Sequence, residues 1–174
     1  MSRAFLKNES ADDPVVIPAR APLPPGVTNY VTPRGLALLH TELDELEAER
    51  GLVQTGTSDE TERTRRLAEL NGRTGALNQR IATARVVDGR EHFQDSVVRF
   101  GAVVTLQNRS GKAGPIERKL TIVGVDEADA SHGLIAFIAP IARLMLGKRI
   151  GESISLPTPR GTNVMEITDI TYTE

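Results

Sequence analysis

Two stretches of the chain repeat apolar residues at alternating spacings of three and four. The first stretch runs through Leu36, Leu39, Leu43 and Leu46, and the second through Leu67, Leu70, Thr74, Leu77, Ile81 and Ala84. Such a repeat aligns apolar side chains along one seam of a helix. A short polar stretch around residues 57–60 separates the two runs. The pattern therefore predicts an antiparallel α-helical coiled-coil hairpin.

Signals at the expected helix ends agree with this prediction. Thr32 followed by Pro33 is typical of an N-cap and a first helical residue. Gly56 predicts the end of the first helix, and Thr57 with Glu60 predicts a capping box that opens the second. The first helix is rich in acidic residues and the second in arginines, so opposite charges flank the seam and favour the pairing.

Beyond residue 96, short apolar runs alternate with turn residues. Strands are expected at residues 97–100, 102–106, 119–124, 134–138, 153–156 and 163–172, with a short helix at 141–147 that Gly147 caps. Strands with one short helix predict an α+β domain. Three parts are therefore expected: an extended proline-rich arm (1–28), the helical hairpin (29–90) and an α+β C-terminal domain (91–174).

The amino-acid composition excludes several kinds of functional site. The chain has no cysteine, which excludes disulfides, zinc–thiolate sites and cysteine nucleophiles and suits the cytoplasm. No stretch approaches the roughly 20 apolar residues that span a bilayer, so no membrane association is expected. The net charge of −2 argues against nucleic-acid binding through overall charge. His40, His92 and His132 stand apart from any ligand pattern, so no metal site and no cofactor of its own are expected.

The most specific motifs lie in the C-terminal part. They are IVGVDEAD at residues 122–129, APIARLMLGK at 139–148 and LPTPRG at 156–161. Their order and spacing, behind a helical hairpin, resemble the C-terminal domain of the bacterial Gre transcript-cleavage and elongation factors. The resemblance extends over residues 29–174.

That resemblance implies an FKBP-like C-terminal domain that binds the rim of the secondary channel of bacterial RNA polymerase. It also implies a coiled coil that enters the channel, and acids at its tip that help the polymerase hold a Mg²⁺ ion for cutting backtracked RNA. The implied polymerase-binding residues are Asp126, Glu127, Asp129, Pro140, Ile141 and Arg143. A monomer is expected.

The expected tip matches the Gre pattern in part. Asp59 and Glu62 have the i, i+3 spacing of the family's acids, with Glu60 between them. Arg63 stands where the family usually has asparagine. Each arm is also shorter than expected by roughly seven residues, or about 10 Å of reach. Acids are in any case favoured in a helix's first turn by its dipole.

Several alternatives stay open. The arginines Arg63, Arg65, Arg66, Arg73 and Arg80 either pair with the acidic helix or contact nascent RNA or the channel wall. The factor either stimulates cleavage or occupies the channel without cleavage and competes with true Gre factors; the short arms favour the second outcome. The rivals are an FKBP-like prolyl isomerase, which the scarcity of aromatic residues disfavours, and a coiled-coil adaptor for another protein.

Overall fold

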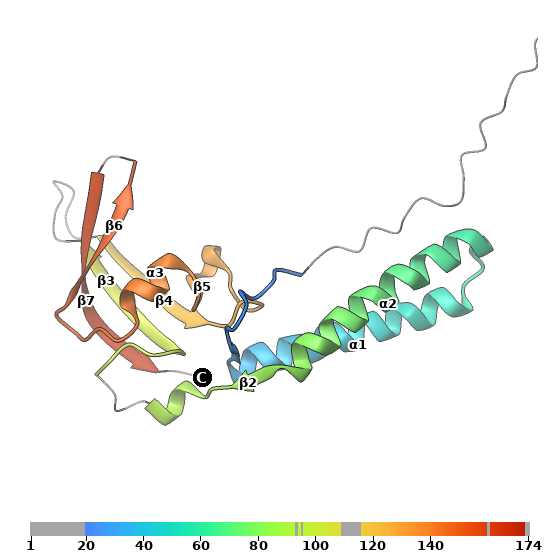
Figure 1. Cartoon of the computed structure of the whole chain (residues 1–174), viewed down its shortest axis with the longest axis horizontal. Helices are drawn as coiled ribbons and strands as arrows, with labels where there is room; N and C mark the ends of the chain where they lie inside the picture. Colours follow the sequence, from blue (N-terminus) through green and yellow to red (C-terminus); the bar gives the residue numbers. More distant parts are fainter. Residues whose placement is uncertain (1–19, 93, 95, 109–115, 160, 173–174) are drawn as a thin grey trace, which may run out of the picture.

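The computed structural model describes residues 20–92, 94, 96–108, 116–159 and 161–172. Over these residues, two long helices lie side by side and project from a curled five-stranded sheet (Figure 1). Residues 1–19 of the expected arm and most of the expected loop at 108–114 lie outside the described residues. The chain is thus a mixed α and β structure, as predicted. No described helix has the length and apolar character needed to cross a membrane.

The helix pair consists of α1 (Pro33–Thr55) and α2 (Glu60–Ala82). Thr32 caps α1 as predicted, because its Oγ1 accepts a hydrogen bond from the Gly35 amide at 2.8 Å. The prediction of a cap at Thr57 is wrong. Asp59 caps α2 instead, and its carboxylate accepts a hydrogen bond from the Thr61 amide at 3.1 Å. An aspartate is also a good N-cap, and it lies directly before the first helical turn.

Leucines fill the seam between the two helices. Leu39 and Leu46 of α1 are 2% and 3% exposed, and Leu70 and Leu77 of α2 are fully buried. Leu36, Leu43, Val53 and Ile81 pack around them at the edges. Each buried leucine contributes about 1.5–3 kcal/mol relative to an exposed one. Burial of the predicted seam therefore stabilises a helix pair whose glycines disfavour it.

A small parallel ladder closes the base of the helix pair. The strand β1 (Asn29–Val31) pairs with β2 (Ala84–Val86), with Val31 opposite Val86. The heptad pattern placed Ala84 in the second helix, and this expectation is wrong: α2 ends at Ala82, and Thr83 is its C-cap. The ladder fixes where the chain enters and leaves the two helices.

The sheet has the strand order β5-β4-β3-β7-β6. Its strands are β3 (Ala102–Asn108), β4 (Ile116–Val123), β5 (Leu134–Ala136), β6 (Ser153–Thr158) and β7 (Gly161–Tyr172). Only β4 and β5 pair in parallel. One face packs against α3 (Pro140–Met145) through Ala142 and Met145, which are fully buried. Two 3₁₀ turns, η1 (Gly89–His92) and η2 (Ala130–His132), complete the described elements.

Three details differ from the predicted elements. No strand forms at 97–100, where Val97 makes an isolated bridge to Arg149 and Gly101 turns the chain at φ +85°. The hydroxyl of Tyr172 holds this segment by donating to the Val97 carbonyl at 2.6 Å. The strand β5 is shorter than 134–138. Leu146 is the C-cap of α3, and Gly147 follows it at φ +83°.

Candidate functional site

The tip of the helix pair presents acidic side chains to solvent. Asp59, Glu60 and Glu62 are all exposed at the end far from the sheet. Asp59 is the N-cap, and Glu60 and Glu62 follow in the first turn of α2. Negative charge is stabilised there by the helix dipole. None of the three forms an ion pair with another described residue, so their carboxylates are open to an outside cation.

A metal site is not complete within the described residues. No group of three or more histidine, aspartate or glutamate side chains gathers to hold an ion. Asp59 and Glu62 offer oxygen ligands, which are the kind that Mg²⁺ prefers. The donor set at the tip therefore suits an ion whose remaining ligands come from another molecule.

Four of the five candidate arginines of α2 divide into two groups. Arg66 pairs with Glu49 across the helix pair and with Glu69, at 2.7 Å, on its own helix. Its hydrogen bond to Glu49 is the main cause that raises its pKa. Arg63, Arg65 and Arg73 make no ion pair with any described residue. Arg66 thus joins the two helices, and the other three cations remain available.

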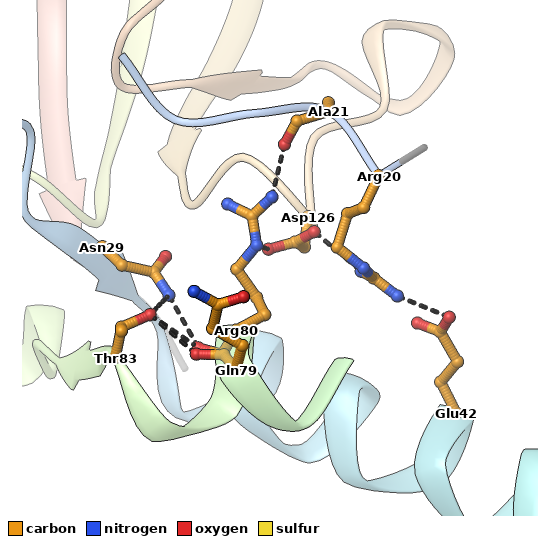
Figure 2. Close-up of polar contacts among 8 residues, drawn as sticks. All are labelled: Arg20, Ala21, Asn29, Glu42, Gln79, Arg80, Thr83 and Asp126. Atoms are coloured by element: carbon orange, nitrogen blue, oxygen red, sulfur yellow. Dashed lines mark hydrogen bonds and ion pairs between the residues drawn. The ribbon is translucent and has the colours of Figure 1, made fainter. Parts of the chain in front are cut away.

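Arg80 does not pair with the acidic helix, so that expectation is wrong for this residue. It is 8% exposed, and its Nε lies 3.4 Å from Oδ2 of Asp126, in the loop after β4. Its guanidinium also donates to the Ala21 carbonyl (Figure 2). The side-chain amide of Asn29 donates a hydrogen bond to the backbone carbonyl of Arg80 at 2.9 Å. Arg80 therefore anchors the base of α2 to the loop and the arm.

Glu127 joins the same loop to the start of α1. Its carboxylate accepts hydrogen bonds from the Thr32 hydroxyl at 2.5 Å and from the Arg34 guanidinium at 3.0 Å. The Glu127 side chain is only 4% exposed. A carboxylate at a helix N-terminus is stabilised by the dipole. A Cβ on Gly35 would lie 2.7 Å from Oε2 of Glu127, so glycine permits this close approach.

Aromatic packing makes the rest of this junction. The ring centroid of Tyr30 in β1 lies 5.9 Å from that of Phe100 and 5.7 Å from that of Phe137. The centroids of Phe100 and Phe137 are 5.7 Å apart. Such tilted and edge-on contacts are favourable beyond the area they bury. A Cβ on Gly124 would lie 2.8 Å from the Tyr30 carbonyl. Among the described residues, the rings of Tyr30, Phe100 and Phe137 thus gather where the helix pair meets the sheet.

Asp129 has a different environment from its two acidic neighbours. It is exposed and caps η2, and its carboxylate accepts hydrogen bonds from the Ser131 hydroxyl at 2.5 Å and amide at 3.0 Å. Its other oxygen lies 2.7 Å from Nδ1 of His132. The hydrogen bonds from Ser131 and then His132 lower the pKa of Asp129 to about 2. Asp129 is therefore a fixed negative charge at the surface.

An open groove of about 560 Å³ is lined by Asp126, Glu127 and Asp129, the acidic residues of the loop after β4 (hereafter the acidic loop). Its lining includes Arg34, Leu38, Asp126, Asp129, His132 and Leu134. Leu38 is 45% exposed, so the groove has an apolar wall on α1 beside the charges of the loop. Arg34, Leu38 and His132 were not predicted as part of this site: His132 follows the predicted motif closely, whereas Arg34 and Leu38 lie on α1, far from it in sequence.

The predicted residues of α3 lie outside this groove's lining. Pro140 and Arg143 are exposed, whereas Ile141 is half-buried against the core. Arg143 makes no ion pair with a described residue. Leu144, beside it, is 39% exposed. The α3 surface thus offers a cation and an apolar side chain together.

The chain is similar to known transcription elongation factors. The family model described as "Transcription elongation factor, GreA/GreB, C-term" matches residues 93–172. The transcription elongation factor GreB of Neisseria meningitidis is 34% identical over 157 residues, which cover 83% of this chain and 94% of that protein. GreB of Pasteurella multocida is 34% identical over 158 residues, which cover 83% of this chain and 97% of that protein. The solved GreA/GreB structure from Nitrosomonas europaea is 23% identical, with coverage of 82% and 98% and a TM-score of 0.41.

Proposed function

The chain belongs to the GreA/GreB family of transcription elongation factors, and from that premise we propose that it binds bacterial RNA polymerase at the secondary channel. The observation that carries the proposal is the position of Asp59, Glu60 and Glu62. All three are exposed and lie at the end of the helix pair that is farthest from the sheet. A factor that delivers carboxylates to a recessed centre needs this shape. Gre factors act as elongation factors and not as enzymes themselves, which counts against the prolyl isomerase alternative.

The finer architecture forms part of the same proposal. The buried leucine seam supports a coiled-coil description of the helix pair. We likewise propose an FKBP-like fold for the sheet with α3, and the division of the chain at residues 28 and 90. In this arrangement the sheet domain binds the channel rim and the coiled coil enters the channel.

The docking surface in this proposal is the acidic loop together with α3. Asp129, Pro140 and Arg143 are exposed and available for direct contact. Ile141 supports them from the core side. Glu127 and Asp126 hold the loop against the helix pair, and Asp126 faces the groove beside Leu38. The available arginines Arg63, Arg65 and Arg73 would contact nascent RNA or the channel wall, because phosphate attracts unpaired cations.

At the tip, Asp59 and Glu62 would add oxygen ligands to a Mg²⁺ ion shared with the polymerase. Such an ion would supply the Lewis acidity needed for cutting backtracked RNA. The chain itself contributes carboxylates held in place by the start of a stable helix. Asp59 keeps one carboxylate oxygen on its helix cap, which fixes the orientation of the other.

A transcript-cleavage assay on stalled elongation complexes tests this role. The matched variants are Asp59→Asn with Glu62→Gln, which remove both charges but keep a capping side chain at residue 59. Glu47→Gln, an exposed acid in the middle of α1, is the control. We expect cleavage with the unaltered chain and the control, and its loss in the double variant. Cleavage that survives the double variant would refute the role of the tip acids.

A second candidate is a channel occupant that does not stimulate cleavage and competes with other Gre factors. The helix lengths favour it, since each helix has 23 residues, or about 35 Å. This is roughly two turns shorter per arm than the resemblance leads us to expect. The same assay separates the two candidates. A chain that binds the polymerase, does not stimulate cleavage and inhibits the cleavage that another Gre factor stimulates would support the non-cleaving channel occupant.

A further inference from the structure

One residue of the arm stands between the two parts of the molecule. Arg20 donates through Nη1 to Oδ1 of Asp126 at 2.7 Å, and through Nη2 to Oε1 of Glu42 at 2.5 Å. Asp126 lies in the loop after β4 and Glu42 lies on α1, so a single guanidinium connects the sheet domain to the helix pair (Figure 2). Arg80 completes the cluster, because it reaches Asp126 and the Ala21 carbonyl.

The cluster is well shielded from solvent. The side chains of Asp126 and Arg80 are each 9% exposed, and that of Arg20 is 22% exposed. Glu42, on the outer side, is 37% exposed. Burial acts to lower the pKa of Arg20, but its hydrogen bonds to Glu42 and Asp126 outweigh burial and raise it. Two cations and two anions balance, and partly buried charge-assisted bonds of this kind are stronger than surface pairs.

The composition of the arm suits it to hold such a position. Prolines at 22, 24 and 25 directly follow the contact residues Arg20 and Ala21. Proline restricts the backbone in every state of the chain, so ordering this segment costs less entropy than ordering a flexible one. The arm also leads directly into β1, which is fixed by its pairing with β2. A contact made at residue 20 is therefore geometrically coupled to the base of the helix pair.

We propose that residues 20–28 form an intramolecular latch that holds the helix pair against the sheet domain and withholds the Asp126 carboxylate from an outside partner. The inference rests on the proposed function in one respect, namely that the partner which competes for Asp126 is RNA polymerase. Arg80 faces only Oδ2 of Asp126, so release of Arg20 leaves Oδ1 open to a donor from the polymerase. Release also frees Glu42 and removes the bridge that Arg20 makes between α1 and the loop, while the ion pair of Arg34 with Glu127 remains. Latching and docking are then alternatives for the same oxygen.

The latch can be tested in the free protein. The chain has no cysteine, so Ser58→Cys at the tip and Thr162→Cys in β7, both exposed positions, give two unique spin-label sites. Distances between the labels are measured by pulsed electron resonance with Arg20 intact, with Arg20→Gln and with Arg85→Gln. Arg85 is an exposed arginine of β2 without an ion pair among the described residues, so it is the matched control. We expect a narrow distribution for the intact chain and the control, and a broader or shifted one for Arg20→Gln.

Polymerase affinity supplies the second arm of the test. Arg20→Gln is expected to bind core polymerase more tightly, on the order of fivefold, because one ion pair no longer opposes docking. Glu42→Gln, which loosens the latch without touching Asp126, is expected to change affinity in the same direction by less. An unchanged distance distribution, or unchanged or weakened affinity in Arg20→Gln, would overturn the latch and leave the proposed function standing. Absence of polymerase binding in every variant would overturn the proposed function and the competition together, whereas the distance result still reports the contact itself.

Discussion

The two ends of the helix pair carry acidic side chains in opposite states. At the tip, Asp59, Glu60 and Glu62 are exposed and make no ion pair with described residues. At the base, Asp126 and Glu127 are nearly buried, and their carboxylates pair with arginines of the helix pair and the arm. Burial thus decides whether an acidic side chain holds the fold together or is available to another molecule. Buried carboxylates must be compensated within the fold, whereas exposed ones can be offered to another molecule.

Contacts at the base of the helix pair fix the direction in which it projects. A helix pair is useful as a probe only if its base is held at a fixed angle. The base of this one is held by the ladder of β1 and β2, by three aromatic rings and by the ion pairs of Asp126 and Glu127. Among the described residues, the outer half of the helix pair has no contact of this kind with the sheet; the apolar seam and the Arg66–Glu49 ion pair keep its two helices together.

The largest contrast is expected for apolar truncations at the two ends. Leu77→Ala, in the fully buried half of the seam near the base, should lower the free energy of unfolding by about 2–5 kcal/mol through loss of packing and creation of a cavity. Leu52→Ala, near the tip and 73% exposed, should change it by less than about 0.5 kcal/mol. Denaturant unfolding followed by circular dichroism measures both. Equal effects would mean that the seam is not the stabilising element.

The next contrast uses the acids themselves. Glu127→Gln should destabilise the fold by about 1–3 kcal/mol, because it weakens the bonds to Thr32 and Arg34 at a buried site. Glu62→Gln at the tip should alter stability by no more than about 0.5 kcal/mol. The same unfolding experiment compares them. A tolerated Glu127→Gln would show that the junction does not depend on this carboxylate.

Within the tip, capping and charge can be separated at one residue. Asp59→Ala should cost about 1 kcal/mol through loss of the helix cap, while Asp59→Asn should cost less because asparagine also caps. Thermal unfolding of the two variants provides the measurement. If both variants lose the same stability, the charge and not the cap is what matters at this position.

The smallest effect is a titration on the surface of the acidic loop. The pKa of Asp129 is lowered to about 2 by Ser131 and His132, so its carboxylate should stay ionised until the pH falls well below the usual range for aspartate. A lowered pKa in the folded state means that any stabilisation is present above the unfolded-state pKa and is lost as pH falls through the folded value. Carbon-detected NMR titration should show a midpoint near 2, and Ser131→Ala should raise it. An ordinary midpoint in the unaltered chain would contradict the observed geometry.

The sequence predicted the regular parts of the molecule well, for physical reasons. Periodic leucines and the Thr32–Pro33 start were enough to place α1, because local signals dominate there. The strand expected at 97–100 failed because a distant hydroxyl, that of Tyr172, and the turn at Gly101 determine its path. Helix α2 ends before Ala84 because pairing with β1 competes with the heptad pattern.

The candidate site shows the same division. The exposure of the tip acids follows from their place at a helix start, which the sequence contains. The partners of Asp126 do not, because Arg20 and Arg80 are 106 and 46 residues away from it. No local pattern marks either arginine as part of a junction. The assignment of Asp126, Glu127, Asp129, Pro140, Ile141 and Arg143 to polymerase binding stays a prediction.

Entry of the helix pair into the secondary channel can be tested with a single cross-linker. Ser58→Cys places a unique thiol at the tip of a chain that otherwise has none. A photoreactive group on that thiol, activated in a stalled elongation complex, should cross-link to polymerase residues around the catalytic Mg²⁺ and to the RNA 3′ end. Cross-links confined to the outer surface of the polymerase, or none at all, would contradict entry of the helix pair into the channel.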